Sequence, residues 1–170
     1  SQITPSTAPT KSAALMFRHL PLALALCLLA LPKHARADAF VTSGASWHAS
    51  SHGGDTAFNE VNPGLGYEHG LNENHTLSLG FYLNSSNRET DYLLDIWQPL
   101  QWTPDFGKLK FGLAMGLVSG YDGNNFMPIA LPMLSYENRT WGLNLIALTF
   151  PTKPLIDKSV FAAQLKIFIP

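Results

Sequence analysis

The sequence predicts an all-β protein, an eight-stranded antiparallel transmembrane β-barrel. From residue 38 onward, apolar residues recur with a period of two, and no stretch keeps a period of 3.6. The alternating segments number eight and are about ten residues long, and short polar turns alternate with longer loops. An even number of such strands is typical of barrels that cross an outer membrane.

Residues 16–37 have the three parts of a secretory signal peptide. A charged start at Met16–His19 precedes an apolar run over Leu20–Leu31, and Ala35–Ala37 fits a cleavage site. The apolar run is shorter than the roughly 20 residues of a transmembrane helix. We therefore expect export and an outer-membrane β-barrel domain over residues 38–170. Residues 1–15 form an upstream segment before the candidate start at Met16, and its translation is left open.

The charge and cysteine content of the barrel segment restrict its partners. Seven of the eleven Lys and Arg residues follow Ala37, as do all twelve Asp and Glu residues, so the net charge is about −5. This balance does not favour binding to nucleic acid. The single cysteine, Cys27, lies in the signal peptide, so we expect neither disulfides nor a thiolate metal site. No metal or organic cofactor is implied.

The first four predicted strands are Phe40–His48, Asn62–His69, Thr76–Leu83 and Tyr92–Trp102. The first two alternate weakly. The third alternates clearly, with Leu or Phe at every odd position from 77 to 83. In the fourth, large apolar residues share the even positions from 92 to 102, interrupted by Gln98.

The last four predicted strands are Lys108–Leu117, Met127–Tyr136, Trp141–Leu148 and Phe161–Ile167. The fifth has the clearest period, because large apolar residues at the odd positions alternate with Lys, Gly and Ala. This pattern suits a lipid-facing exterior and a lumen lined by Gly112, Ala114 and Gly116. A soluble barrel of the lipocalin kind is the alternative, and the signal peptide and aromatic last strand favour the membrane.

Topology predicts which residues meet at one rim of the barrel. If the N-terminus is periplasmic, odd-numbered strands end at the outer rim, which places the ends of the first and third strands there. Parity puts Trp47 outside and His48 inside, while Asn84 faces in and Ser85 starts a loop. Histidine beside a hydroxyl suits acyl transfer, because imidazole can take the proton at neutral pH. The alternatives are that this pair is an ordinary rim pair, or that His52 is the base.

Small residues and prolines predict a route for a lipid chain. The inward Gly112, Ala114 and Gly116 would leave a narrow apolar slot, unless Tyr82, Trp97 and Asn144 fill it. Counting eleven residues from Ser85 places Ile96 at the floor of this slot, whereas a shift of one residue in register would move the floor to a residue of the other face. Proline donates no ladder hydrogen bond, so Pro128, Pro132, Pro151 and Pro154 predict an unpaired stretch of wall beside the sixth and seventh strands.

Seven stretches of the chain resemble one protein family. They are SWHAS (46–50), FNEVNPGLGYE (58–68), GFYLNSSNR (80–88), FGLAMGLVSGYD (111–122), MPIALPML (127–134), LTFP (148–151) and FAAQLKIF (161–168). In this order, and over nearly all of residues 38–170, the chain resembles the PagP-type lipid A palmitoyltransferases of Gram-negative outer membranes. It looks like a divergent member.

The resemblance implies transfer of palmitate from a phospholipid to lipid A by a monomeric barrel whose lumen holds one acyl chain. It implies a catalytic group at His48, Asn84 and Ser85, and substrate contacts in the lumen. It also implies lateral openings flanked by Pro63 on one side and by Pro128 and Pro151 on the other. Tyr82, Gly112, Ala114, Gly116 and Ile96 are the expected lumen contacts.

Two departures from the family pattern leave rivals open. Asn84 stands where the family has a carboxylate, so Asp55, Asp91 or Asp122 would have to replace it, and the amphipathic helix before the first strand is missing. One rival is a lipid A deacylase or outer-membrane phospholipase, since His48-x-Ser50 superficially resembles a deacylase motif. The other is a non-enzymatic barrel, which predicts a lumen packed with charged pairs.

Overall fold

The computed structural model describes residues 38–48, 59–122, 125–149 and 159–169. These form eight strands, and the predicted all-β fold is confirmed. The strands are β1 (Asp38–His48), β2 (Val61–Gly70), β3 (His75–Leu83), β4 (Glu89–Trp102), β5 (Lys108–Asp122), β6 (Asn125–Glu137), β7 (Trp141–Thr149) and β8 (Ser159–Ile169). Each contains or largely overlaps its predicted segment.

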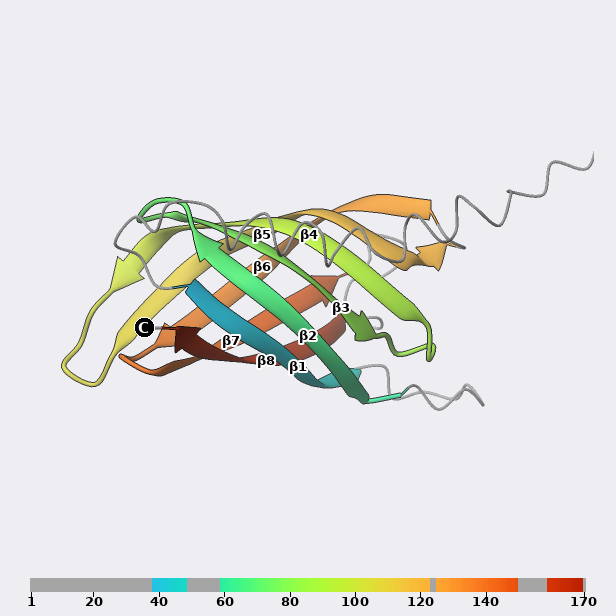
Figure 1. Ribbon diagram of the computed structural model, residues 1–170, viewed down its shortest axis with the longest axis horizontal. Helices are drawn as coiled ribbons and strands as arrows, with labels where there is room; N and C mark the ends of the chain where they lie inside the picture. Colours follow the sequence, from blue (N-terminus) through green and yellow to red (C-terminus); the bar gives the residue numbers. More distant parts are fainter. Residues whose placement is uncertain (1–37, 49–58, 123–124, 150–158, 170) are drawn as a thin grey trace, which may run out of the picture. The chain divides into compact units, whose positions relative to one another are not determined.

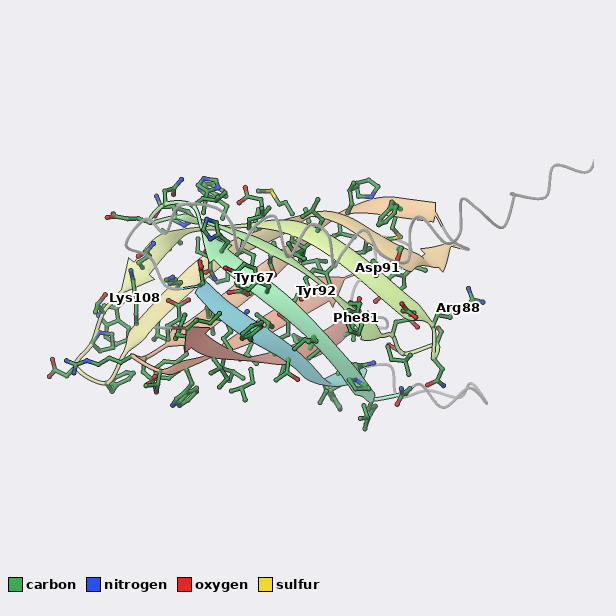
Figure 2. All side chains as sticks on the ribbon, in the orientation of Figure 1. Tyr67, Phe81, Arg88, Asp91, Tyr92 and Lys108 are labelled. Carbon is green, nitrogen blue, oxygen red and sulfur yellow. The ribbon has the colours of Figure 1, made fainter. Side chains whose placement is uncertain are left out.

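The strands form a closed antiparallel barrel in which each strand pairs with the next and β1 pairs with β8 (Figure 1). Closure leaves no strand with a wholly unpaired side, which lowers the usual risk of edge-to-edge association. Short turns at 71–74, 103–107 and 138–140 define one end, called here the turn rim. The ends of β1, β3, β5 and β7 meet at the opposite end, called the loop rim. Lys108 lies at the turn rim and Arg88 at the loop rim (Figure 2).

The outer face of the barrel is apolar and aromatic. In β5, β7 and β8 the outward positions are those predicted from the period, and most inward ones are small or polar, with Val118 and Ile146 as apolar exceptions. Near the loop rim, Trp47 stacks on Phe161 at 5.8 Å between ring centroids. At the turn rim, a chain of ring contacts joins Trp102, Phe106, Tyr136 and Trp141. The outer face therefore has an aromatic cluster near each rim.

In strand β4 the positions that face inward are not of one parity along the whole strand. Its register with β5 shifts between Trp97 and Leu100, so the parity changes there. Before the shift the even positions are inside, and Ile96 is 3 % exposed, whereas Leu100 beyond it is 64 % exposed. Some large apolar residues of β4 therefore lie inside the barrel and others lie on its outer face. Trp97 lies on the outer face and does not fill the lumen.

Strand β1 carries a second irregularity, between Ser43 and Ala45. Ala39 and Val41 are buried before it, and Ser46 is buried after it, so the inward positions change from odd to even. This change explains why the alternation of β1 is weak in the sequence. It leaves Trp47 outward, as predicted, and places position 48 on the inner parity.

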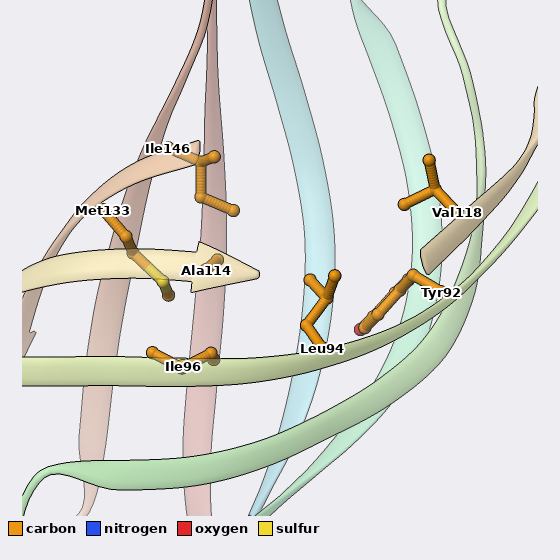
Figure 3. Packing of buried hydrophobic residues seen from close by; sticks show 7 residues of the cluster. All are labelled: Tyr92, Leu94, Ile96, Ala114, Val118, Met133 and Ile146. Carbon is orange, nitrogen blue, oxygen red and sulfur yellow. The ribbon is translucent and has the colours of Figure 1, made fainter. Parts of the chain in front are cut away.

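The interior of the barrel has an apolar part and a charged part. The apolar cluster comprises Tyr92, Leu94, Ile96, Ala114, Val118, Met133 and Ile146 (Figure 3). Charged and polar side chains fill the interior near the turn rim. No helix in the described ranges is long and apolar enough to cross a membrane.

Candidate functional site

His48 is the last residue of β1, at the loop rim, and its backbone pairs with Val160 of β8. The neighbouring Trp47 is 59 % exposed on the outer wall. Successive residues of a strand point to opposite faces, so position 48 belongs to the inner face. The side chain of His48 lies outside the described residues.

Ser85 follows β3 at the same rim. Its carbonyl oxygen accepts a hydrogen bond from the Asn59 N–H at 3.0 Å, and the Ser46 N–H donates to the Glu60 carbonyl at 2.9 Å. The segment 59–60 therefore lies between the end of β1 and the start of the β3–β4 loop. The backbones at 48 and 85 are about two strand spacings apart, roughly 10 Å. The structure thus brings the two predicted positions to one side of the mouth.

Asn84 is 1 % exposed, and its side chain organises the β3–β4 loop. Its amide Nδ2 donates to the Thr90 hydroxyl at 3.1 Å and to the Gly120 carbonyl at 3.2 Å. Its Oδ1 accepts from the Ser86 and Arg88 N–H groups at 2.9 and 3.1 Å. Carbonyl oxygens only accept and N–H groups only donate, so this orientation of the amide is fixed by chemistry. Asn84 therefore positions the loop that carries Ser85.

The loop conformation depends on this asparagine. Residues 84–88 form a tight turn in which the Asn84 N–H donates to the Arg88 carbonyl at 2.8 Å. Asn87 has φ of 56°, a left-handed conformation that asparagine tolerates better than most residues. The sequence NSSNR thus encodes a turn that holds Ser85 at the rim.

Of the three carboxylates considered as substitutes, only Asp91 has a described side chain, and it does not lie beside Asn84 on the inner face. Asp91 pairs with the outward-facing Phe81 across β3 and β4. It therefore lies on the outer wall, where both residues are labelled in Figure 2. Asp55 and the Asp122 side chain lie outside the described residues, as does the competing base His52.

The wall is unpaired over part of its height at two places. The β6–β7 ladder comprises five residue pairs and ends toward the loop rim at Met133 and Ile146, one residue before Pro132. Pro128 lies further along the same unpaired stretch of β6, which is paired only with β5. Proline lacks the N–H needed for a ladder bond, which explains why the pairing stops here. Pro151 and Pro154 lie outside the described residues.

The second unpaired place lies between β2 and β3. Their ladder ends toward the loop rim at Gly64 and Tyr82, next to Pro63. Beyond it, the Asn62 side chain bridges the strands by donating Nδ2 to the Leu83 carbonyl at 2.9 Å. A shallow hollow of about 400 Å³ lies here, lined by Pro63, Gly64, Leu65, Phe81, Tyr82, Leu83 and Glu89.

The loop-rim half of the lumen is lined by apolar and tyrosine side chains together with buried polar ones such as Asn62, Asn84 and Thr90. Met127, Ile129 and Leu131 of β6 pack against the buried cluster and remain partly exposed. Tyr82 and Tyr121 face each other across the interior, with their hydroxyl oxygens 2.6 Å apart. Deeper, Ile96, Ala114, Met133 and Ile146 form a buried layer, grouped together in Figure 3. Ile96 thus belongs to the buried layer below this lining.

The inward glycines of β5 have a different physical reason from the predicted one. A Cβ at Gly112 would collide with the Trp97 carbonyl oxygen, and one at Gly116 with the Leu93 carbonyl oxygen. Glycine is therefore required at both positions by the close approach of the β4 backbone. Extra room in the lumen is not the reason for these two residues.

The turn-rim half of the lumen holds a charged network that the sequence analysis missed. Lys166 Nζ lies 3.0 Å from Glu68 Oε2 and 2.7 Å from Glu137 Oε1, and Lys110 Nζ lies 2.6 Å from Glu137 Oε2. Asn144 Nδ2 donates to Glu68 Oε1 at 2.9 Å. The alternation of side chains in the sequence could have revealed this network, because its four charged residues occupy inward positions of β2, β5, β6 and β8.

Polar side chains extend this network across the lumen. Gln98 donates to the Ser135 hydroxyl, and Ser135 donates to Asn144 Oδ1, both at 2.8 Å. The network and its extension block this end of the barrel with side chains that are hydrogen-bonded to one another. Among the described residues, these side chains close the turn-rim end of the lumen to an apolar ligand.

The histidines near the turn rim have partners among the described residues. His69 Nδ1 lies 2.8 Å from Asp38 Oδ1, and the Tyr67 hydroxyl donates to Asp38 Oδ2 at 2.7 Å. His75 Nδ1 lies 3.0 Å from Asp95 Oδ2. Nowhere in the described ranges do three His, Cys, Asp or Glu side chains gather as metal ligands.

No protein-family model matches the chain, and no curated protein matches its sequence. Only the resemblance of the seven stretches and the geometry of the loop rim therefore bear on function.

Proposed function

We propose that this protein is an outer-membrane acyltransferase that moves a fatty acyl chain, palmitate in the family it resembles, from a phospholipid to lipid A. The observation that carries the proposal is the placement of positions 48 and 85 on one side of the loop rim. Ser46, two residues before position 48, and Ser85 are both hydrogen-bonded to the segment 59–60, and an apolar cluster lies in the lumen. This arrangement offers a base and a hydroxyl where a lipid ester could reach them.

The outer face supports a location in the outer membrane. Exposed Phe, Leu and Ile side chains cover the strands between the aromatic clusters of the two rims. Aromatic residues are enriched at both interfaces of membrane barrels, because their rings suit the headgroup region. The signal peptide expected at residues 16–37 would export the chain to this location.

The acyl chain of the donor would lie in the loop-rim half of the lumen. It would pass the unpaired stretch between β6 and β7 and contact Met127, Ile129 and Leu131, which are partly exposed. Burial of each CH₂ group contributes about 0.8 kcal/mol. The buried layer at Ile96 and the charged network below it would stop the chain.

The reaction would proceed by general-base catalysis. His48 takes the proton of a lipid A hydroxyl, whose oxygen attacks the ester carbonyl of the phospholipid. The bond to the glycerol oxygen breaks, and that oxygen receives the proton from His48, which releases a lysophospholipid. Ser85 either donates a hydrogen bond to the reacting oxygen or carries the acyl group in a two-step route. Asn84 holds the loop that presents Ser85.

The test compares variants at the rim with matched controls. His48→Ala and Ser85→Ala should leave a folded, heat-modifiable barrel that transfers no labelled palmitate to lipid A. His75→Ala at the turn rim and Ser86→Ala in the same loop should keep transfer. Retained transfer in both rim variants would refute the assignment. Mass spectra of lipid A distinguish the deacylase reading, since lipid A then loses an acyl mass instead of gaining one.

A second candidate, a non-enzymatic structural barrel, is favoured by the charged network at the turn rim. Three ion pairs in the lumen match the packing predicted for that class. The partly exposed apolar lining of the loop-rim half does not match it. Unchanged lipid A and phospholipid in cells that overproduce the protein would support this candidate.

A further inference from the structure

Two buried polar atoms beside position 48 have no hydrogen-bond partner among the described residues. They are the Ser46 hydroxyl oxygen and Asn62 Oδ1. Ser46 is 9 % exposed and Asn62 is 6 % exposed. Buried polar groups in native proteins nearly always have partners, and an exception points to a water, a ligand or a functional role. Neither atom is used in the mechanism above.

The two atoms are neighbours on the inner face. Ser46 lies two residues before His48 on the same parity of β1, and its N–H donates to the Glu60 carbonyl. Asn62 lies two residues beyond Glu60 on β2. Ser46 and Asn62 are therefore diagonal neighbours across the two strands, a separation of about 8 Å or less. Both residues lie further from the loop rim than position 48, the position of the proposed base.

The orientation of the Asn62 amide is fixed by its other contacts. Nδ2 donates to the Leu83 carbonyl at 2.9 Å and to the Asn59 carbonyl at 3.4 Å. A reversed amide would place its oxygen against two oxygens that only accept, so the unpartnered atom is the carbonyl Oδ1. The pair thus offers one atom that only accepts and one hydroxyl that donates or accepts.

This combination distinguishes lipid A from phosphatidylcholine, the phospholipid whose headgroup has no hydrogen-bond donor. Phosphatidylcholine carries ester and phosphate oxygens, which only accept, and it has no donor for Asn62 Oδ1. Lipid A carries sugar hydroxyls and amide N–H groups, which donate. Phosphatidylcholine bound at this rim would therefore leave Asn62 Oδ1 unpaired, whereas lipid A can satisfy it.

We propose that Ser46 and Asn62 bind a hydroxyl or amide group of lipid A that is separate from the reacting hydroxyl. This inference rests on the proposed function, since it names the residues that select its acceptor. The bound group donates its hydrogen to Asn62 Oδ1, and its oxygen accepts a hydrogen bond from the Ser46 hydroxyl. The reacting hydroxyl then remains free to give its proton to His48.

The test measures the unfolding temperature of the purified protein with and without lipid A, and with dipalmitoyl phosphatidylcholine. Lipid A should raise the unfolding temperature of the wild type, because a ligand that binds only the folded state stabilises it. Ser46→Ala should lose most of this shift and keep the phosphatidylcholine shift. Without lipid, Ser46→Ala should unfold at the same or a higher temperature, since it removes an unpaired buried hydroxyl.

Kinetics supply the second measurement. Ser46→Ala should raise the KM for lipid A about tenfold and leave kcat and the donor KM unchanged, as expected for one hydrogen bond. Asn62→Leu should act in the same direction, although it also loses the bond to Leu83. The matched control is Ser119→Ala, because the Ser119 hydroxyl accepts from the Asp91 N–H at 2.9 Å. It should lower the unfolding temperature and keep the KM for lipid A.

The outcomes separate this inference from the proposed function. A lipid A shift that depends on Ser46, in a protein without transferase activity, would keep the binding site and refute the enzyme. Absence of a lipid A shift in the wild type would overturn the binding site. A Ser46→Ala variant that keeps the shift and is destabilised like Ser119→Ala would also overturn it, and would indicate a buried structural water.

Discussion

Replacing Lys166 by methionine tests whether the charged network stabilises the barrel. Lys166 is 3 % exposed and contacts both Glu68 and Glu137. At an effective dielectric constant of about 20, two unit charges 3.0 Å apart attract each other by roughly 5 kcal/mol. The cost of burying the charges offsets much of this attraction. Removing only one partner leaves a buried charge without compensation and typically costs about 3–5 kcal/mol.

The contacts that remain after the substitution indicate which carboxylate loses its charged partner. Glu137 keeps Lys110 as a partner at 2.6 Å, whereas Glu68 keeps only the amide of Asn144. We therefore expect Lys166→Met to lower the free energy of unfolding by about 3–5 kcal/mol. A second change, Glu68→Gln, should recover part of this loss because it removes the unpaired carboxylate and keeps an oxygen that can accept from Asn144.

The assay is reversible urea unfolding of the barrel in lipid bilayers, followed by tryptophan fluorescence. Lys108→Met is the matched control, since Lys108 lies at the same rim (Figure 2) without an ion pair among the described residues. It should change the free energy of unfolding by no more than about 0.5 kcal/mol. A Lys166→Met variant within that same margin of the wild type would contradict the reasoning, as would strict additivity of Lys166→Met and Glu68→Gln.

Two further predictions concern buried polar contacts of the interior. Asn84→Asp, although it restores the carboxylate of the family pattern, should lower the free energy of unfolding by about 1–3 kcal/mol, because aspartate cannot donate to the Gly120 carbonyl. Urea unfolding measures this loss, and an unchanged midpoint would show that the loop does not depend on the Asn84 amide. Gly66→Ala should cost about 1–3 kcal/mol, since its methyl group would collide with the Tyr92 hydroxyl. Tyr92→Phe should recover part of that cost in the double variant, and failure to do so would place the strain in the backbone of β3.

The period of two was sufficient to predict the strands, because the side-chain alternation of a strand is fixed by its backbone geometry. It placed the outer faces of β5, β7 and β8 correctly, and it placed Trp47 outside. It failed in the middle of β4, where Gln98 interrupts the alternation at a change of register. A single irregularity moves every following residue to the other face, and which side of it lies inward depends on pairing with the neighbouring strands.

The candidate site was predictable in position and not in its contacts. The alternation and the order of turns were enough to place His48 and Ser85 at one rim. They gave no indication that Asn84 would use all its hydrogen-bonding groups within the protein, or that Ser46 and Asn62 would be left with unpartnered oxygens. Such contacts depend on differences of a few tenths of an ångström in the relative positions of strands that are far apart in sequence.

The sequence by itself determined the number of strands, their order and most of the outer face, because these follow from local alternation and from turn residues. Only the tertiary structure decided how the interior is divided between an apolar half and an ion-pair network. Lys166 and Glu68 lie 98 positions apart, and they meet only because β8 returns to β1 and closes the barrel. Closure is a property of the whole sheet, and it decides which inward side chains become partners.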